Sequence, residues 1–489
     1  MRSQTLTSRG NYLGGELRRP PDFDAELVSL DPHSGEPVGR LQVSLHDVER
    51  AVTAASDARR AWRETELATR IAAVQRVAKE LEARGEELAR RITREVGKPL
   101  WEARTEVKAA IAKVGVSVEE GLALVREVTL EDGSSYAPAP HGVLAVLGPF
   151  NFPLHLMHGH VVPALLMGNT VVLKPSEVAP FVGELYAEVM HAAGLPAGVF
   201  NLVQGGAEVG AALAAHPGVQ GVLFTGSYRA GLAIQRATLE QPGKLLALEM
   251  GGKNPALVLA DAPLDKALHD VAWGAYVTTG QRCSGTALCL VERPLLEAVQ
   301  AGLTRMLPGI RVGDPFSEVF MGPLATAGAR AALETQLAAA RSAGVEQVAS
   351  SEAPSGAAYA PATLHRVEQF DSTQPYLTEE LFGPDLTLMP IDDLEHGIEI
   401  ANALPYGLSA SVFTASASRF EWARGHLEYG CINHNAPTPG ASSRLPFGGV
   451  KQSGNHRPAA LWSSLYCSYP VATLRGGTTR PALSPGLDW

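Results

Sequence analysis

Hydrophobic residues in the stretch 142–249 form short uninterrupted runs separated by longer amphipathic segments. The runs predict strands, and the segments between them predict helices near 155–167, 181–193, 206–215 and 228–240. Strands without polar alternation are typical of parallel sheets that are covered on both faces. We therefore predict a doubly wound α/β domain whose ligands bind at the carboxyl ends of the strands. The predicted strands are Gly142–Leu147, Thr170–Leu173, Val199–Leu202, Gly221–Phe224 and Leu245–Leu248.

The flanking segments show other patterns. Within residues 46–96, apolar residues recur at three- and four-residue steps, which predicts amphipathic scaffold helices. Residues 255–435 repeat the α/β alternation less regularly, with an alanine-rich helix around 325–342. The tail after Arg475 is rich in Gly and Pro and is predicted to be a surface extension.

Composition narrows the class of protein. A chain of 489 residues suggests about two to four domains, and 45% hydrophobic with 19% charged residues is an ordinary globular balance. The net charge of -10 argues against a nucleic-acid partner, which usually requires a basic field. It does not exclude a small anionic ligand, because a pocket sets its own local potential.

The cysteines and the apolar stretches indicate a cytoplasmic protein. Four cysteines are too few for a disulfide scaffold and lie in no CxxC pair, so we expect a reducing compartment. The longest apolar stretch, Val161–Leu173, is interrupted by Gly168 and Asn169 and is too short to span a membrane. The N-terminal run MRSQTLTSRGNYLGGEL lacks the apolar region of a secretory signal, although a transit peptide stays open.

Three segments contain candidate catalytic groups. Cys283 has small or polar neighbours and follows Gly280, and the adjacent Arg282 can help to stabilise a thiolate. Glu249 directly follows a predicted strand and is either a capping residue or a general base. Asn151, three residues after the glycine that follows another strand, is either a turn former or an oxyanion donor.

Two further segments are candidates for binding a nucleotide. Lys174 and Glu177 follow a predicted strand and can grip a ribose, or they form a surface ion pair. Gly226, Ser227 and Gly231 lie in a glycine turn that opens a helix, where free N–H groups attract phosphate. The spacing is neither a Rossmann nor a Walker pattern, so by itself this signal is weak.

Taken together, these segments and their order resemble the aldehyde dehydrogenase superfamily from about residue 40 to residue 475. The resemblance implies two α/β domains with a β arm for oligomerisation. The further matching runs are Glu379–Pro384 (EELFGP), Asn402–Leu408 (NALPYGL) and Leu445–Gly454 (LPFGGVKQSG).

The resemblance also implies a role for each matching residue. Cys283 is the expected nucleophile, Glu249 the general base, and Asn151 an oxyanion donor beside the Cys283 N–H. The expected cofactor is NAD, and no metal is expected. The residues expected to bind the cofactor are Lys174 and Glu177 at the adenosine ribose, Gly226, Ser227 and Gly231 at the pyrophosphate, Glu380 at the nicotinamide ribose and Phe382 against the nicotinamide.

The Glu177 carboxylate accepts hydrogen bonds from a ribose 2′-hydroxyl but repels a 2′-phosphate. This side chain therefore favours NAD over NADP.

Other runs resemble one subfamily, the N-succinylglutamate 5-semialdehyde dehydrogenases of arginine catabolism. They are His155–Leu156, Gly159–Leu166, and Ser453–Pro458 (SGNHRP) continuing to Tyr466–Pro470. The sequence departs from that pattern at His158, at Ser284–Thr286, at His434 and at Ala436, and these departures bear on the substrate more than on the chemistry.

The implied substrate is an anionic semialdehyde. Its candidate contacts are Arg282, Arg444, His155 and His160, each of which can instead be a structural or surface residue. Neutralising Arg444 is expected to raise KM for a charged semialdehyde while sparing a neutral aldehyde.

Other functions stay open. They are a glutamate or succinate semialdehyde dehydrogenase, a CoA-dependent acylating enzyme and a non-catalytic member of the superfamily. Glu249 argues against the acylating enzyme, and the joint presence of Cys283, Glu249 and Asn151 argues against a non-catalytic protein.

The resemblance divides the chain into three parts. Residues 1–119 and 141–250 form the expected NAD-binding domain, and residues 251–445 the expected catalytic domain. Residues 120–140 and 446–489 form the arm, which includes a strand near Cys467–Leu474, and the tail. Such arms extend a partner's sheet, so we expect a homodimer or a homotetramer that binds neither nucleic acid nor membrane.

Overall fold

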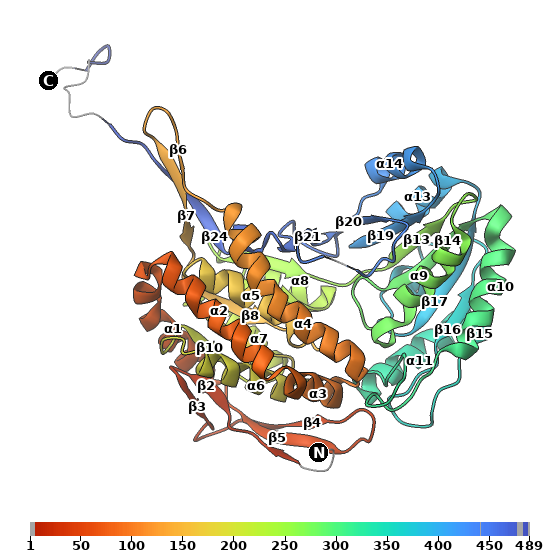
Figure 1. Cartoon of the computed structure of the whole chain (residues 1–489), viewed down its shortest axis with the longest axis horizontal. Coiled ribbons are helices and arrows are strands. Elements are labelled where there is room, and N and C mark those ends of the chain that lie inside the picture. Colours follow the sequence, from red (N-terminus) through yellow and green to blue (C-terminus); the bar gives the residue numbers. More distant parts are fainter. Residues whose placement is uncertain (1–4, 441, 477–482, 488–489) are drawn as a thin grey trace.

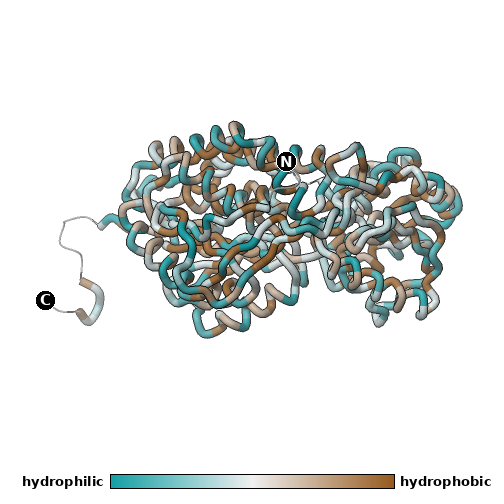
Figure 2. The backbone as a smooth tube through the Cα atoms, turned by 90° about the horizontal axis from the view of Figure 1, so that it is seen from below, coloured by the Kyte–Doolittle hydropathy of each residue, from teal (hydrophilic) through white to brown (hydrophobic). Residues whose placement is uncertain are grey.

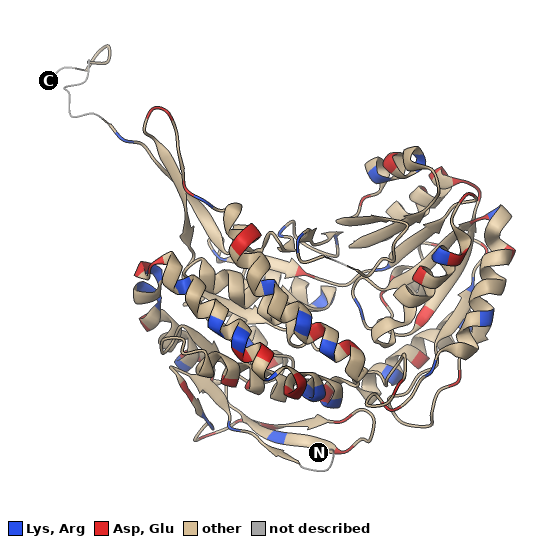
Figure 3. Ribbon diagram, in the orientation of Figure 1, with Lys and Arg blue, Asp and Glu red and all other residues tan. Residues whose placement is uncertain are grey.

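Two seven-stranded sheets dominate the computed structural model, which describes residues 5–440, 442–476 and 483–487. Each sheet carries helices on both faces, and the two resulting bodies lie side by side (Figure 1, Figure 2). This arrangement confirms the predicted fold class. Lys, Arg, Asp and Glu concentrate on the helices and loops, and the central strands carry few of them (Figure 3).

The first sheet contains all five predicted strands, each within one residue of its predicted ends. Alternate residues of β8 enter different apolar cores: Leu144 and Val146 pack on one face, and Val143 and Ala145 pack on the other. Burial on both faces explains why these strands read as continuous apolar runs. In spatial order the strands are β12 (Leu245–Glu249), β11 (Gly221–Thr225), β8 (Val143–Leu147), β9 (Thr170–Lys174), β10 (Phe200–Leu202), β2 (Asn11–Leu13) and β3 (Glu16–Arg18).

The N-terminal strands were not predicted. β2 pairs antiparallel with β10, and β2 pairs antiparallel with β3, so the first residues of the chain complete a sheet that is otherwise parallel. A separate three-stranded sheet has the order β1 (Leu6–Thr7), β5 (Pro37–Val43) and β4 (Ala25–Leu30).

The helices over the first sheet agree with the periodicity. The helix predicted over 228–240 ends three residues earlier than expected, and the other three predicted helices differ by one residue at most. They are α5 (His155–Leu166), α6 (Pro180–Ala192), α7 (Ala207–Ala215) and α8 (Tyr228–Ala237). The N-terminal helices are α1 (His46–Glu64), α2 (Leu67–Ala83), α3 (Gly85–Val96) and α4 (Leu100–Val116), and a π-helical turn, η1, follows at Ser117–Gly121.

The second sheet is also parallel except at one edge, where β15 pairs antiparallel with β16. Its order is β15 (Glu346–Ser350), β16 (Thr363–Arg366), β17 (Asp385–Ile391), β14 (Thr286–Glu292), β13 (Asn254–Val258), β19 (Ser409–Phe413) and β20 (Cys431–His434). The helices are α9 (Leu264–Tyr276), α10 (Leu296–Met306), α11 (Ala327–Ser342), α12 (Pro375–Thr378), α13 (Leu394–Ala403) and α14 (Ala417–His426). Three 3₁₀ turns are η2 (Val277–Gly280), η3 (Arg293–Leu295) and η4 (Leu307–Gly309).

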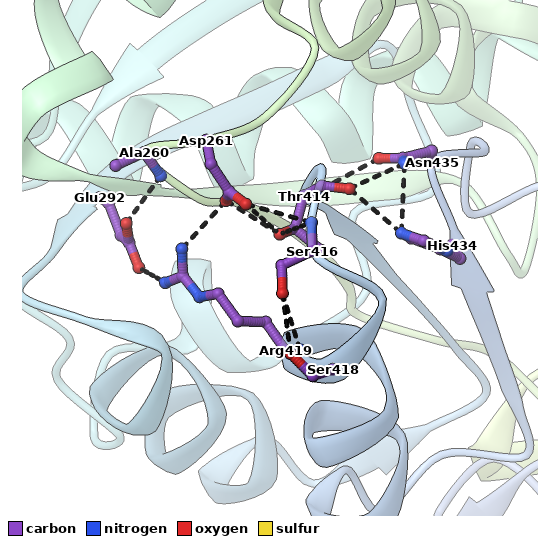
Figure 4. Close-up of polar contacts among 9 residues, drawn as sticks. All are labelled: Ala260, Asp261, Glu292, Thr414, Ser416, Ser418, Arg419, His434 and Asn435. Carbon is purple, nitrogen blue, oxygen red and sulfur yellow. Dashed lines mark hydrogen bonds and ion pairs between the residues drawn. The ribbon is translucent and has the colours of Figure 1, made fainter.

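A polar cluster joins the strand ends on one side of the second sheet (Figure 4). The Arg419 guanidinium, on α14, pairs with Asp261 at 2.9 Å and also contacts Glu292. The Thr414 hydroxyl donates to Asp261 at 2.8 Å, and His434 contacts the Thr414 carbonyl at 3.1 Å. His434, one of the departures from the subfamily pattern, therefore belongs to this structural cluster.

The strand pairing of the predicted arm is present. β24 (Ser468–Thr473) pairs antiparallel with β7 (Ser135–Pro140), which pairs with β6 (Val128–Thr129). This sheet projects from the first body (Figure 1). Short strands connect the arm to the two bodies: β18 (Tyr406–Gly407) with β22 (Val450–Lys451), and β21 (Pro446–Phe447) with β23 (Ala459–Ala460), followed by α15 (Ser463–Tyr466). The predicted tail after Arg475 lies partly outside the described residues; residues 483–487 are exposed.

Candidate active site

The carboxyl ends of four neighbouring strands bring most of the predicted groups to one edge of the first sheet. Lys174 and Glu249 are the last residues of β9 and β12. In the registers of the sheet, Lys174 lies opposite Leu147 and Glu249 lies opposite Thr225. Asn151 lies four residues after Leu147, in the loop that follows β8. The parallel order of the strands therefore explains how segments far apart in sequence meet.

The segment that leads to Cys283 has an unusual backbone. Thr278, Thr279 and Gly280 have φ values of 58°, 55° and 70°, in the left-handed region that threonine rarely adopts. The Thr279 hydroxyl donates to the Gly322 carbonyl at 3.1 Å, which helps to hold this conformation. Strained backbone persists where its surroundings fix it, and such segments cluster at functional sites.

Gly280 has a second constraint besides its positive φ. A Cβ at this position would lie 2.1 Å from the carbonyl oxygen of Gly383. Only glycine therefore lets the segment before Cys283 pack against the loop that follows Glu380.

Arg282 is held by helix α4. Its Nη2 lies 2.8 Å from a carboxylate oxygen of Glu102, and its guanidinium stacks over the rings of Phe152 and Trp273 at 5.0 and 5.4 Å. Glu102 also accepts a hydrogen bond from the Thr278 hydroxyl. Arg282 is thus an anchor for the cysteine segment, and its charge is balanced within the fold.

Cys283 is a partly buried thiol in acidic surroundings. Burial and the nearby carboxylates of Glu380 and Glu249 raise the pKa of Cys283 to about 12, which outweighs the lowering by Arg282. The expected stabilisation of a thiolate by Arg282 is therefore insufficient by itself. The thiol carries its proton at neutral pH and requires a base.

Glu249 has the properties of such a base. Burial raises its pKa well above the ordinary carboxyl value, although the N–H groups of Ala459 and Gly449 lower it in part. Among the described residues, its Oε2 has no hydrogen-bond partner. A carboxylate with a raised pKa accepts a proton more readily than an exposed one.

Asn151 connects the β8 loop to the cysteine segment. Its Nδ2 donates to the carbonyl of Gln281 at 2.9 Å, and its Oδ1 accepts the N–H of Phe152 at 3.1 Å. These bonds fix the amide and leave one of the two Nδ2 hydrogens available. A fixed donor beside a thiol can stabilise an oxyanion that forms on the attacked carbon.

The proposed adenosine-ribose pair lies at the end of β9. The Lys174 Nζ is 3.3 Å from a carboxylate oxygen of Glu177 and also donates to the Gly205 carbonyl at 2.7 Å. Glu177 is 50% exposed, so much of its carboxylate remains open to a ligand. Lys174, by contrast, is buried and its ammonium is bonded within the fold.

The glycine turn after β11 opens helix α8. Ser227 caps this helix, because its Oγ accepts the Ala230 N–H at 3.3 Å. A Cβ at Gly231 would lie 2.3 Å from the sulfur of Met250, so glycine allows α8 to approach the end of β12. The Gly226 N–H donates to the Glu249 carbonyl at 3.0 Å.

Glu380 and Phe382 reach the site from the second body. A Glu380 oxygen accepts the Gly252 N–H at 3.0 Å, and burial raises the pKa of this carboxyl to about 7. The Phe382 ring meets Phe150 edge to face, with ring centroids 5.8 Å apart. The candidate site therefore lies between the two sheets, and each body contributes candidate residues.

The remaining substrate candidates have different surroundings. His160 contacts the Tyr466 hydroxyl at 2.8 Å and the Thr225 hydroxyl at 3.2 Å, so both ring nitrogens are engaged. Arg444 is 69% exposed and pairs with Glu120 at 3.0 Å. His155 differs, because among the described residues its buried Nδ1 has no hydrogen-bond partner.

Charged residues of α4 escaped the sequence analysis. Glu106 pairs with Lys98 at 2.5 Å, and its other oxygen accepts the N–H groups of Leu154 and His155 at 2.9 and 3.1 Å. Glu102, Glu106 and Lys113 are buried on the same face as the apolar residues of this helix. The sequence signal that could have identified these residues is their spacing, which places them on the same helix face as the apolar residues.

The chain is similar to known proteins over almost its whole length. The pattern of the aldehyde dehydrogenase family matches residues 21–469. The N-succinylglutamate 5-semialdehyde dehydrogenase of Novosphingobium aromaticivorans is 40% identical over 483 residues, covering 95% of this chain and 99% of the relative. N-succinylglutamate 5-semialdehyde dehydrogenase 1 of Caulobacter vibrioides is 40% identical over 474 residues, with the same coverage.

A solved structure gives the same result for the fold. Aldehyde dehydrogenase C of Pseudomonas syringae, in complex with NAD+ and octanal, superposes with a TM-score of 0.91 and 31% identity. The match covers 97% of this chain and 98% of that one. Within the described part of the chain, no helix is long and apolar enough to cross a membrane.

Because the family pattern and relatives of 40% identity cover most of its length, the chain belongs to the aldehyde dehydrogenase family.

Proposed function

We propose that the protein oxidises N-succinylglutamate 5-semialdehyde to N-succinylglutamate with NAD, as a step of arginine catabolism. The observation that carries the chemistry is the partly buried Cys283 thiol, which interacts electrostatically with Glu249 and Glu380. The substrate rests on the relatives of 40% identity that have this name.

The proposed reaction begins at Cys283. Glu249 takes the thiol proton, and the sulfur attacks the aldehyde carbon to give a thiohemiacetal. The remaining Asn151 amide hydrogen and the Cys283 N–H stabilise the oxygen on that carbon. NAD, when bound, would supply the hydride acceptor, and loss of the hydride from this carbon would leave a thioester on the sulfur. Glu249 passes the thiol proton to solvent and is again a carboxylate. It then removes a proton from water, the resulting hydroxide attacks the thioester carbon to give the carboxylic acid, and the proton returns to the sulfur to regenerate the thiol.

The groups along the strand ends fit a dinucleotide. The exposed carboxylate of Glu177 can accept hydrogen bonds from ribose hydroxyls, and Glu380 supplies a second carboxylate near Cys283. The start of α8 at Gly226 and Ser227 offers peptide N–H groups to a pyrophosphate, with Gly231 allowing the close approach of the helix. Lys174 orients Glu177, and Phe382 packs beside the nicotinamide ring of the cofactor. Glu177 makes NAD the preferred cofactor over NADP.

For the anionic part of the substrate, His155 is the preferred candidate contact because its Nδ1 is unengaged. Arg444 is exposed and can attract an anion toward the site. Arg282 and His160 keep their structural partners and shape the surroundings of the substrate.

We also propose that the arm mediates a homodimer or a homotetramer in the cytoplasm. β24 is an edge strand of its sheet, and Tyr469, Val471, Tyr136 and Leu130 on the arm are exposed. An exposed apolar edge favours pairing with another chain. Four cysteines without a disulfide fit a reducing compartment.

The decisive experiment measures kcat/KM by NADH formation with N-succinylglutamate, glutamate and succinate semialdehydes and with simple aliphatic aldehydes. We expect the first substrate to be preferred, and Cys283→Ala to abolish NADH formation with all of them. A preference for glutamate or succinate semialdehyde would replace the proposed substrate by that one. Activity that survives in Cys283→Ala would contradict the mechanism.

A further inference from the structure

Helix α4 contains a buried ammonium group that has no counter-charge among the described residues. Lys113 is only 2% exposed, and its Nζ donates to the Ala460 carbonyl at 2.6 Å. Within the described part of the chain, no carboxylate forms an ion pair with Lys113. A buried charge without an opposite charge is unfavourable, and burial accordingly lowers the pKa of Lys113 to about 8.

A second basic group lies near Lys113, as does the buried Cys467 thiol. His155, on the adjacent α5, has a buried Nδ1 without a hydrogen-bond partner among the described residues. Burial, Lys113 and Lys98 lower the pKa of His155 to about 4, so Lys113 lies close enough to this ring to repel a charge on it. Two basic groups thus share a buried region.

Most of the other charged and basic groups of the region have partners within the fold. Glu102 pairs with Arg282 at 2.8 Å, and Glu106 pairs with Lys98 at 2.5 Å. His160 contacts Tyr466 and Thr225 through its two ring nitrogens. His158 contacts the Tyr186 hydroxyl through Nδ1 at 2.8 Å, whereas its Nε2 has no hydrogen-bond partner among the described residues. Lys113 and His155 retain unused hydrogen-bonding capacity, two hydrogens on Nζ and the Nδ1 position, and among the described residues His158 retains it at Nε2.

This pair lies beside the reacting groups. Ala460, which accepts the Lys113 bond, follows Ala459, whose N–H lowers the pKa of Glu249. His155 is the first residue of α5, four residues after Asn151. The start of α5 is therefore adjacent along the chain to the expected oxyanion donor, and we take the remainder of the substrate to extend toward it.

We infer that Lys113 and His155 form a carboxylate subsite, which binds a carboxylate of the semialdehyde while the aldehyde lies at Cys283. This inference rests on the proposed function, because it requires an anionic substrate. The carboxylate supplies the counter-charge that Lys113 lacks and the hydrogen-bond partner that His155 lacks. The same pair disfavours a purely aliphatic aldehyde, since such a chain would leave both groups unpaired.

The test compares charged and neutral aldehydes in full-length variants with NAD. For Lys113→Met we expect kcat/KM with N-succinylglutamate 5-semialdehyde to fall by about 30-fold or more, mainly through KM, because one partner of a buried charged contact is removed. With octanal we expect a change of less than about 3-fold, since no carboxylate is present. Lys108→Met is the matched control, because Lys108 is exposed on the same helix, and it should change neither value.

Equal losses with both aldehydes would overturn the inference, because Lys113 would then act only by holding the Ala460 strand beside Glu249. No loss with either aldehyde would overturn it as well. If Lys113→Met does not fold, His155→Phe gives the same comparison, with an expected selective loss of about 5-fold or more for the charged substrate.

The proposed function can fail separately. If wild-type protein prefers glutamate or succinate semialdehyde, the proposed substrate is wrong. The contrast between that anionic substrate and octanal still tests Lys113 and His155.

Discussion

The ion pair between Glu102 and Arg282 connects α4 to the residue before Cys283, and its removal should lower both stability and activity. The Nη2–Oε1 distance is 2.8 Å, and the side chains are 3% and 16% exposed. At an effective dielectric constant of about 20, two unit charges at this distance attract by about 6 kcal/mol before desolvation is counted. Removing one partner of a buried pair costs about 3–5 kcal/mol, because the other charge remains uncompensated. Because the guanidinium keeps some exposure and two aromatic contacts, we expect about 3 kcal/mol for Glu102→Leu.

A double-mutant cycle measures this coupling. Arg282→Met should also destabilise the protein, because it leaves the Glu102 carboxylate buried and unpaired. The double variant replaces the pair by apolar side chains and should recover at least about 1.5 kcal/mol of the summed single losses in urea unfolding. Glu64→Leu, which removes the exposed ion pair with Arg60, is the control and should have no measurable effect.

The same variants test the role of the pair in positioning Cys283. Displacement of a reacting group by about 1 Å can cost about 100-fold in rate, so we expect kcat/KM of Glu102→Leu to fall by about this factor. The rate at which iodoacetamide alkylates Cys283 should change as well. Strictly additive losses of stability in the cycle, or an unchanged alkylation rate, would refute the reasoning.

Further outcomes follow from other groups of the site. Glu249→Gln should lower turnover by about 100- to 10,000-fold and leave an acyl adduct on the protein that mass spectrometry detects. A turnover that stays within about 10-fold of the wild-type value would contradict the assigned base. Because burial raises the pKa of Glu249, and the base acts when deprotonated, deacylation in the wild type should accelerate with rising pH well above the usual carboxyl range, and a rate that is already flat at pH ~5 would contradict this. Gly280→Ala should inactivate and destabilise the protein, because its φ is 70° and the new Cβ would meet backbone; Gly425→Ala, with nothing within 4 Å, should leave activity intact and is the control. Glu177→Gln should reduce the preference for NAD over NADP, and comparable kcat/KM with both cofactors in the wild type would contradict the assigned role of this carboxylate.

The sequence by itself determined the first sheet and most of its helices. Strands such as β8 and β9 are buried on both faces, so nearly every residue is apolar and the pattern is visible without knowledge of the partners. The same reasoning located Glu249 and Asn151, because parallel strands present their carboxyl ends to ligands. Cys283 was found from its small and polar neighbours and from the family resemblance.

Only the tertiary structure decided how distant segments meet. The short strands β2 and β3 carry no periodic signal, and their place beside β10 depends on backbone pairing across the chain. The environment of Cys283 likewise depends on Glu380, about one hundred residues away, whose charge helps to raise the thiol pKa.

Charge balance was also decided by contacts in space. Arg282 was predicted to act on the thiolate or the substrate, whereas Glu102 on α4 holds it. Lys113 was not singled out at all, since a lysine in a helix is usually solvated. Its burial without a counter-charge exists only after α4 has packed against α5 and the Ala460 strand. A sequence specifies which groups are present, but burial and distance, which set their energies, are properties of the folded chain.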